Sequence, residues 1–136
     1  MKKIFSITII LLFLSIQLKA QLDTMNYLKQ FEANKAHYIG QPFSKLLNDM
    51  TQIQPKTIWN RPPRNNKNII LQSSFNFCIK NQTFNNNVIN LVITWQDYIP
   101  YSQTYYYSQK NSFYFTNDEK IFYGNKIIKD IWVYRY

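Results

Sequence analysis

The sequence predicts an α+β fold in which two N-terminal helices pack on an antiparallel sheet of four to five strands. Apolar residues recur at helical spacing before residue 51, whereas they alternate with polar residues after residue 68. The length of 136 residues is that of one domain. We therefore expect a single small α+β domain at residues 21–136, preceded by a leader at residues 1–20.

The leader has the pattern of a secretory signal peptide. Two lysines precede an apolar stretch at residues 4–16, and Ala20 ends a cleavage-like sequence. A stretch of about 13 residues is shorter than the roughly 20 that a membrane-spanning helix needs. We therefore expect an exported protein, periplasmic or secreted, that does not span a membrane after cleavage; an uncleaved anchor is the alternative. Cleavage removes three lysines and lowers the formal net charge from +9 to +6.

Two amphipathic helices are expected before residue 51. The first covers residues 22–38, where apolar side chains follow a near-helical spacing at Leu22, Met25, Leu28 and Phe31. The second covers residues 42–50: it opens with a proline, which suits the first position of a helix. Its apolar positions follow the i, i+3, i+4, i+7 rule at Phe43, Leu46, Leu47 and Met50. Gly40 either closes the first helix in a left-handed conformation or belongs to the link between the two.

Strands are expected from residue 54 onward. Residues 54–59 predict a short strand, and residues 61–67 predict an irregular loop because two adjacent prolines exclude a central strand. Residues 69–80 and 89–96 both alternate apolar and polar side chains, and residues 81–87 between them favour a turn. These two strands are expected to form an antiparallel hairpin whose second face is largely polar.

The C-terminal third is harder to assign. Residues 100–111 favour a helix or loop, although their three consecutive tyrosines also suit a strand. Residues 113–115 predict a strand, residues 116–120 its turn and residues 121–123 the returning strand. A last strand is expected at residues 127–134.

The composition excludes several kinds of chemistry. The chain has one histidine, one cysteine, seven acidic residues and two glycines. A structural or surface role for His37 is favoured over general base catalysis, and a couple with Cys78 lacks any thiol-protease signature. The acidic pair Asp118 and Glu119 lies outside any calcium-binding pattern, and neither zinc spacing nor a glycine-rich phosphate loop is present. We therefore expect no metal site, no cofactor and no catalytic residue.

A basic aromatic segment is the first candidate binding feature. No acidic residue lies between positions 49 and 97, and the segment carries Lys56, Trp59, Arg61, Arg64 and Lys67. Adjacent prolines stiffen it, which lowers the entropy lost on binding. Such a loop suits an anionic glycan or an acidic protein; an exported protein would seldom meet nucleic acid, which is not expected as a partner. The alternative is a solvated loop that keeps the domain soluble.

The second candidate feature is a run of tyrosines at Tyr105, Tyr106 and Tyr107. Consecutive side chains in a helix or strand point in different directions, so the three rings cannot all enter one core. At least one ring is therefore expected to be exposed or at an interface, where it would stack on a sugar or a protein partner, unless it only covers the edge of the core.

Three functions are compatible with these features. The first is a small exported, non-catalytic binding or accessory protein that uses the basic segment and the tyrosines. The second is an inhibitor or immunity-type protein that blocks one enzyme. The third is a small hydrolase, which would need two carboxylates among Glu32, Asp49 and Asp97 to converge in space.

Overall fold

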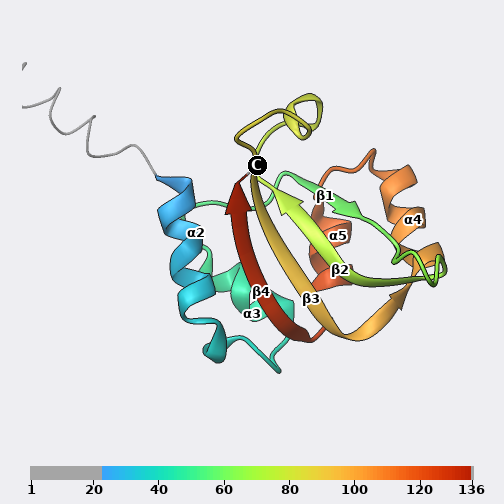
Figure 1. The fold of residues 1–136 in the computed structure, drawn as a ribbon, viewed down its shortest axis with the longest axis horizontal. Coiled ribbons are helices and arrows are strands. Elements are labelled where there is room, and N and C mark those ends of the chain that lie inside the picture. The colour runs from blue at the N-terminus through green and yellow to red at the C-terminus, as the bar shows by residue number, and fades with distance from the viewer. Residues whose placement is uncertain (1–22, 136) are drawn as a thin grey trace, which may run out of the picture.

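The computed structural model describes residues 23–135, which form a mixed α+β fold around a four-stranded antiparallel sheet of order β1-β2-β3-β4 (Figure 1). The strands are β1 (Thr57–Asn60), β2 (Ile69–Asn76), β3 (Ile89–Pro100) and β4 (Ile128–Arg135). The α+β class predicted from the sequence is thus confirmed. The expected signal peptide lies outside the described residues.

Four α-helices accompany the sheet in the described part of the chain. They are α2 (Thr24–Ala33), α3 (Phe43–Asp49), α4 (Tyr101–Lys110) and α5 (Asn117–Gly124), with short 3-10 turns at Lys35–His37 and Lys80–Gln82. In Figure 1, α3 and α5 lie behind the sheet, and no helix crosses the front of β2, β3 and β4. Across residues 23–135, every helix is too short or too polar to cross a membrane.

One face of the sheet carries the hydrophobic core. The register aligns a row of apolar side chains across all four strands, and all of them are buried: Ile58, Phe75, Leu91 and Val133. Phe43 of α3 lies against Phe75 with ring centroids 4.7 Å apart, and Tyr123 of α5 contacts the same ring edge-on at 5.9 Å. The core therefore joins this face to the helices behind it, and the opposite face is left without a helical cover.

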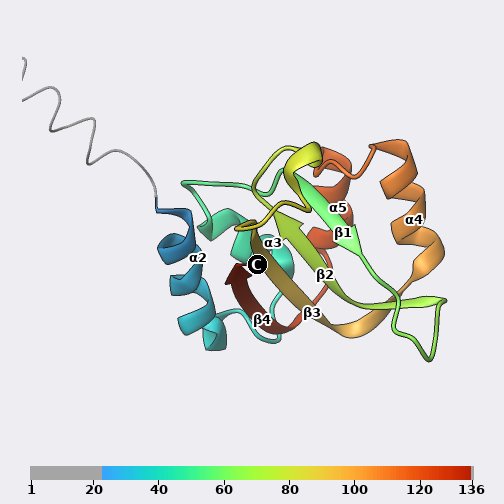
Figure 2. The ribbon, with the colours of Figure 1, turned by 45° about the horizontal axis from the view of Figure 1, so that its top comes forward.

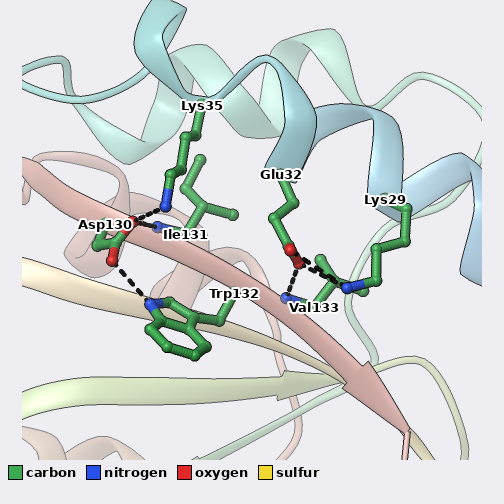
Figure 3. A network of polar contacts seen from close by, with 7 residues as sticks. All are labelled: Lys29, Glu32, Lys35, Asp130, Ile131, Trp132 and Val133. Atoms are coloured by element: carbon green, nitrogen blue, oxygen red, sulfur yellow. Dashed lines mark hydrogen bonds and ion pairs between the residues drawn. The ribbon is translucent and has the colours of Figure 1, made fainter.

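The outer edge of β4 is closed by side chains (Figure 3). The carboxylate of Glu32 in α2 accepts a hydrogen bond from the backbone N–H of Val133. Asp130 accepts one from the N–H of Ile131 at 2.9 Å and forms an ion pair with Lys35 at 2.7 Å. These carboxylates occupy donors that would otherwise be available to an added strand.

Several elements agree with the sequence prediction. The helix expected at residues 42–50 is α3, and the hairpin expected from residues 69–80 and 89–96 is the β2–β3 pair. The segment at residues 100–111 is helical, as favoured, and the last strand is β4. The first helix is shorter than expected: α2 ends at Ala33, and Gly40, at φ +80°, belongs to the link that follows.

The prediction of a hairpin at residues 113–123 is wrong, because the second half of this segment belongs to helix α5. Thr116 is the N-cap, and it forms a capping box with Glu119, which favours a helix start at the place where a turn was expected. The first half of the predicted hairpin lies beside β1, where Thr57 and Tyr114 form one isolated bridge.

Candidate functional site

The open face of the sheet is polar and aromatic. The alternation of side chains along each strand places two rows of residues on it. The first row is Trp59, Ser74, Val92 and Trp132, and the second is Thr57, Asn76, Asn90 and Tyr134. A sheet face with so many amides, hydroxyls and aromatic rings differs from the apolar face that builds the core.

A groove of about 530 Å³ lies on this face. One wall comes from the loop between β1 and β2, with Arg61, Pro62, Pro63 and Arg64. Thr83 and Phe84 of the β2–β3 connection line it as well, and strand residues that include Ser74, Asn76, Asn90 and Val92 form its floor. Figure 2 shows that connection beside β1, with the β1–β2 loop projecting from the other end of β2. We call this site the open-face groove.

Unpartnered polar atoms are concentrated at the open-face groove. Within residues 23–135, four buried side-chain polar atoms have no hydrogen-bond partner: Thr57 Oγ1, Trp59 Nε1, Asn76 Oδ1 and Thr83 Oγ1. Trp59, Asn76 and Thr83 line the groove, and Thr57 lies on the same sheet face. Buried polar groups are nearly always hydrogen-bonded in folded proteins, so this concentration calls for an explanation.

A network of amides holds Asn76 in one orientation. Its Nδ2 donates to the side-chain oxygen of Asn90 at 2.6 Å and to the carbonyl of Ile89 at 3.2 Å. Ser74 donates to the same Asn90 oxygen at 3.0 Å, and Asn90 donates to the carbonyl of Val88 at 3.1 Å. Because both acceptors face the nitrogen of Asn76, its own oxygen is left buried without a partner.

Aromatic rings surround the Trp59 side of the groove. The Trp59 ring stacks on Phe113 with centroids 4.4 Å apart, and Phe84 lies 5.0 Å from Trp59 at an angle of 59°. Phe113 adopts a φ of 66°, which is unusual for a bulky residue. Lys80 lies 5.2 Å from the centre of the Phe113 ring. The Phe84 side chain is 79% exposed, so an uncovered aromatic surface stands at the mouth of the groove.

The structure divides the basic segment predicted as a site. Trp59, Arg61 and Arg64 line the open-face groove together, and both arginines are exposed. Lys56 and Lys67 are also exposed, but neither lines the groove. The segment is therefore a groove wall at its centre and ordinary solvated surface at its two ends.

The predicted tyrosines lie on a different element. Tyr105, Tyr106 and Tyr107 belong to α4, and none of them lines the open-face groove. Tyr105 and Tyr106 are exposed, as the helical geometry requires, whereas Tyr107 packs on Phe122 with centroids 4.7 Å apart. The structure therefore does not bring the tyrosines and the basic loop into one site.

Sequence reasoning missed the floor and one end of the groove. The alternation in residues 69–80 did indicate a polar second face, which is the face that carries Asn76. Asn90 could have been found by pairing that strand with the next one. Thr83 and Phe84 gave no signal, because they lie in a connection whose path over the sheet depends on tertiary packing.

The titratable residues elsewhere have structural contacts. Glu32 is paired with Lys29 at 3.1 Å, and Asp49 accepts a hydrogen bond from the hydroxyl of Tyr38 at 2.9 Å. Burial and Asp49 raise the pKa of Tyr38 to about 12. No group of three or more His, Cys, Asp or Glu side chains that could hold a metal ion occurs within residues 23–135.

Cys78 lies at a second, smaller cavity. This cavity has a volume of about 320 Å³ and is lined by residues that include Thr24, Phe77 and Cys78. The thiol is partly exposed, and His37 belongs to the 3-10 turn that follows α2. The cavity lining contains no His, Asp, Glu, Lys or Arg that would activate the thiol.

Comparison of the chain with protein-family models, with curated proteins and with solved structures finds no match. Function must therefore be inferred from the chemistry of the open-face groove. Its lining supplies guanidinium donors from the exposed Arg61 and Arg64 and the exposed ring of Phe84. The unpartnered polar atoms of Trp59, Asn76 and Thr83 are buried. The lining contains no His, Cys, Lys, Asp or Glu.

Proposed function

We propose that this chain is a small exported, non-catalytic binding protein, and that the open-face groove is its site for an anionic ligand. The observation that carries the proposal is the pair of exposed arginines, Arg61 and Arg64, in a groove that the exposed ring of Phe84 also lines.

The charge of the groove favours an anion. Arg61 and Arg64 are exposed, and no acidic side chain lines the groove. A guanidinium presents donors in a rigid fork that matches carboxylates and phosphates. Export to the periplasm or beyond, which the leader predicts, would bring the groove to an anionic glycan or an acidic protein rather than to nucleic acid.

The proposal includes the finer arrangement expected from the sequence, with two N-terminal helices on the sheet face opposite the groove. Phe43 of α3 and Leu28 of α2 are buried in the same core as Phe75 of β2. Both side chains support an arrangement in which one face of the sheet carries the hydrophobic core and the opposite face binds the ligand.

A second candidate is an inhibitor or immunity-type protein that blocks one enzyme. The observation that favours it is Phe84, which is 79% exposed at the mouth of the groove, because exposed aromatic anchors are enriched among interface hot spots. An inhibitor would form a stoichiometric complex with one protein in size-exclusion chromatography, whereas it would not bind an isolated anionic polymer in the groove.

The test compares two double variants that remove the same charge from the same segment. Arg61→Ser with Arg64→Ser changes the groove, and Lys56→Ser with Lys67→Ser is the matched control, because these lysines do not line it. Binding of polygalacturonate and polyglutamate would be followed by tryptophan fluorescence at low and high salt. We expect roughly tenfold weaker binding for the arginine pair only. Equal weakening by both pairs would show general charge attraction and contradict the proposal.

A further inference from the structure

The open face of the sheet carries exposed apolar side chains beyond the open-face groove. Trp132 of β4 is 59% exposed, and it does not line the groove. Its cross-strand partner on β3 is Val92, which does line the groove. Leu71 of β2 lines the groove as well, and its side chain is exposed. The apolar surface of this face therefore extends from the groove onto β4, so a ligand that only fills the groove would leave Trp132 uncovered.

The ring of Trp132 is held in one orientation. Its indole N–H donates to one carboxylate oxygen of Asp130 at 2.7 Å, and the other oxygen is paired with Lys35, also at 2.7 Å (Figure 3). The ring is thus ordered in the free protein. A side chain that is already ordered loses less conformational entropy on association. Tryptophan is also enriched among the residues that dominate protein–protein binding, so Trp132 is suited to anchor a partner.

The surroundings of Trp132 favour apolar side chains over sugar hydroxyls. A saccharide that stacks on an aromatic ring has hydroxyl groups that need donors or acceptors beside the ring. Here the indole N–H and both oxygens of Asp130 already have partners, and the residue opposite on β3 is the apolar Val92. Within the groove, the polar atoms that lack a partner are buried. An apolar side chain needs none of these groups.

The charge of the groove favours an acidic partner over a second copy of this chain. Arg61 and Arg64 are exposed, and no Asp or Glu lines the groove. Two copies that met through this face would bring their arginines together, and juxtaposed like charges disfavour association. Arginine and aromatic residues are enriched in protein interfaces, whereas Lys, Asp and Glu are depleted. The open face has this composition at Arg61, Arg64, Phe84 and Trp132.

The edges of the sheet give little opportunity for strand addition, in which main-chain hydrogen bonds provide the affinity. The outer edge of β1 is occupied, because Ile58 N–H donates to the carbonyl of Phe113 and Phe115 N–H donates to that of Lys56. Glu32 occupies the Val133 donor at the edge of β4. A partner would therefore contact the side chains of the open face.

We infer that the partner of this protein is an acidic polypeptide with apolar side chains, which lies across the open face from Arg61 and Arg64 to Trp132. Its carboxylates pair with the two guanidinium groups, and its apolar side chains pack on Trp132, Leu71 and Phe84. This inference rests on the proposed function and names the kind of partner for the same face.

The first experiment measures binding of three anionic polymers to the mature chain by titration calorimetry. The probe is a glutamate-rich copolymer of glutamate and tyrosine. The comparison polymers are polyglutamate, which keeps the charge and lacks the apolar side chains, and polygalacturonate, which has a saccharide backbone. Concentrations are expressed per carboxylate. We expect the copolymer to bind roughly tenfold or more tightly than either comparison polymer, because only the copolymer covers both the arginines and Trp132.

The second experiment tests the anchoring role of Trp132. Trp132→Ala and Tyr106→Ala remove rings of nearly equal exposure, but Tyr106 lies on α4 and not on the sheet. We expect Trp132→Ala to weaken copolymer binding roughly fivefold or more and to leave polyglutamate binding unchanged. Tyr106→Ala should change neither. Thermal unfolding would show that each variant folds, and Leu71→Ala is an independent variant at an exposed position of the same face.

The outcomes separate this inference from the proposed function. If polyglutamate or polygalacturonate binds as tightly as the copolymer, and the binding depends on Arg61 and Arg64, the polypeptide inference is overturned and the anion-binding function stands. If none of the polymers binds in a manner that depends on these arginines, both are overturned. If Trp132→Ala and Tyr106→Ala have the same effect on copolymer affinity, the open face beyond the groove is not the docking surface and the inference fails.

Discussion

The side-chain nitrogen of Asn76 donates a 2.6 Å hydrogen bond to the side-chain oxygen of Asn90, across the open face of β2 and β3. Both amides are almost fully buried, and the Asn76 oxygen is left without a partner. A satisfied polar network makes a sheet face rigid, whereas an incomplete one costs stability. The unpartnered Asn76 oxygen is therefore expected to lower the stability of this sheet face.

The first prediction concerns this stability cost. Thr57→Val removes a buried hydroxyl without a partner and keeps the β-branched shape, so we expect the free energy of unfolding to rise by about 1 kcal/mol. Thr104→Val is the matched control. Its hydroxyl is equally buried but donates to the carbonyl of Tyr101 at 2.9 Å, so this variant is expected to lose about 1 kcal/mol. Urea denaturation measures both, and a loss in both would contradict the assignment of Thr57.

The second prediction separates binding from folding at Phe84. The ring is exposed, so Phe84→Ala is expected to change the free energy of unfolding by no more than about 0.5 kcal/mol. The same change is expected to weaken ligand binding about fivefold, because it removes the aromatic surface at the mouth of the groove. Tyr106→Ala on α4 removes a comparably exposed ring that does not line the groove, and it should leave affinity unchanged. Equal affinity of Phe84→Ala and Tyr106→Ala for the ligand would show that Phe84 is not part of the binding site.

The sequence could predict those elements in which the apolar pattern repeats over many residues. Phe43, Leu46, Leu47 and Met50 repeat over two helical turns, and the alternation in β2 and β3 extends over enough residues to fix their period. In α5 the apolar run is only Ile121, Phe122 and Tyr123, which carries no period. There the capping residues decided the outcome, because Thr116 and Glu119 satisfy the first backbone donors of a helix.

The site could be predicted only where one segment supplies neighbouring residues. Trp59, Arg61 and Arg64 are close in sequence, and they remain together in one groove wall. Phe84 reaches the same groove from the β2–β3 connection, and no local pattern reveals that path. The tyrosines of α4 are close in sequence to one another but lie on an element that does not line the groove.

The third prediction concerns alkaline pH. Burial and the hydrogen bond to Asp49 raise the pKa of Tyr38 from 10.0 to about 12. The folded protein therefore favours the neutral phenol, and this contribution to stability is complete below pH 10.0 and is lost as the pH rises towards about 12. We expect Tyr38→Phe to be less stable than the wild type at pH 8. This difference in the free energy of unfolding should shrink as the pH rises from 10.0 to about 12. Urea denaturation across this range measures the difference, and a constant difference would contradict the mechanism.

The fourth prediction concerns acid pH and the contact between α2 and β4. The hydrogen bond from Lys35 lowers the pKa of Asp130 below 3.8, and bonds from Trp132 and Ile131 add to the effect. Its stabilising contribution is therefore complete above pH 3.8 and is lost as the pH falls through the lower value of the folded state. We expect Asp130→Asn to lower the free energy of unfolding at pH 7 by no more than about 1 kcal/mol, since the pair is partly solvated. The difference in the free energy of unfolding between Asp130→Asn and the wild type should vanish in acid. Asp97→Asn is the control, because Asp97 lies at an exposed position of β3.

The last prediction tests the helix that replaced the expected hairpin. Glu119 is almost fully buried, and its carboxylate accepts hydrogen bonds from the backbone N–H of Thr116 at 2.8 Å and from Asn111 at 2.7 Å. Thr116→Ala removes the N-cap hydroxyl, so we expect a loss of about 1 kcal/mol and faster amide exchange in the first turn of α5. Thr116→Ser keeps the cap and should behave like the wild type.

Glu119→Gln would probe the same box from the other side. The amide oxygen of Gln can still accept from the Thr116 N–H, but its NH2 group would face the donating NH2 of Asn111 in a buried site. The variant therefore loses one acceptor as well as the charge that favours a helix N-terminus, so a loss at least as large as that of Thr116→Ala is expected. Unchanged amide exchange of α5 in Thr116→Ala would show that packing of Tyr123 alone holds the helix. In that case the capping residues would not explain why residues 117–124 fold as a helix rather than as the predicted strand.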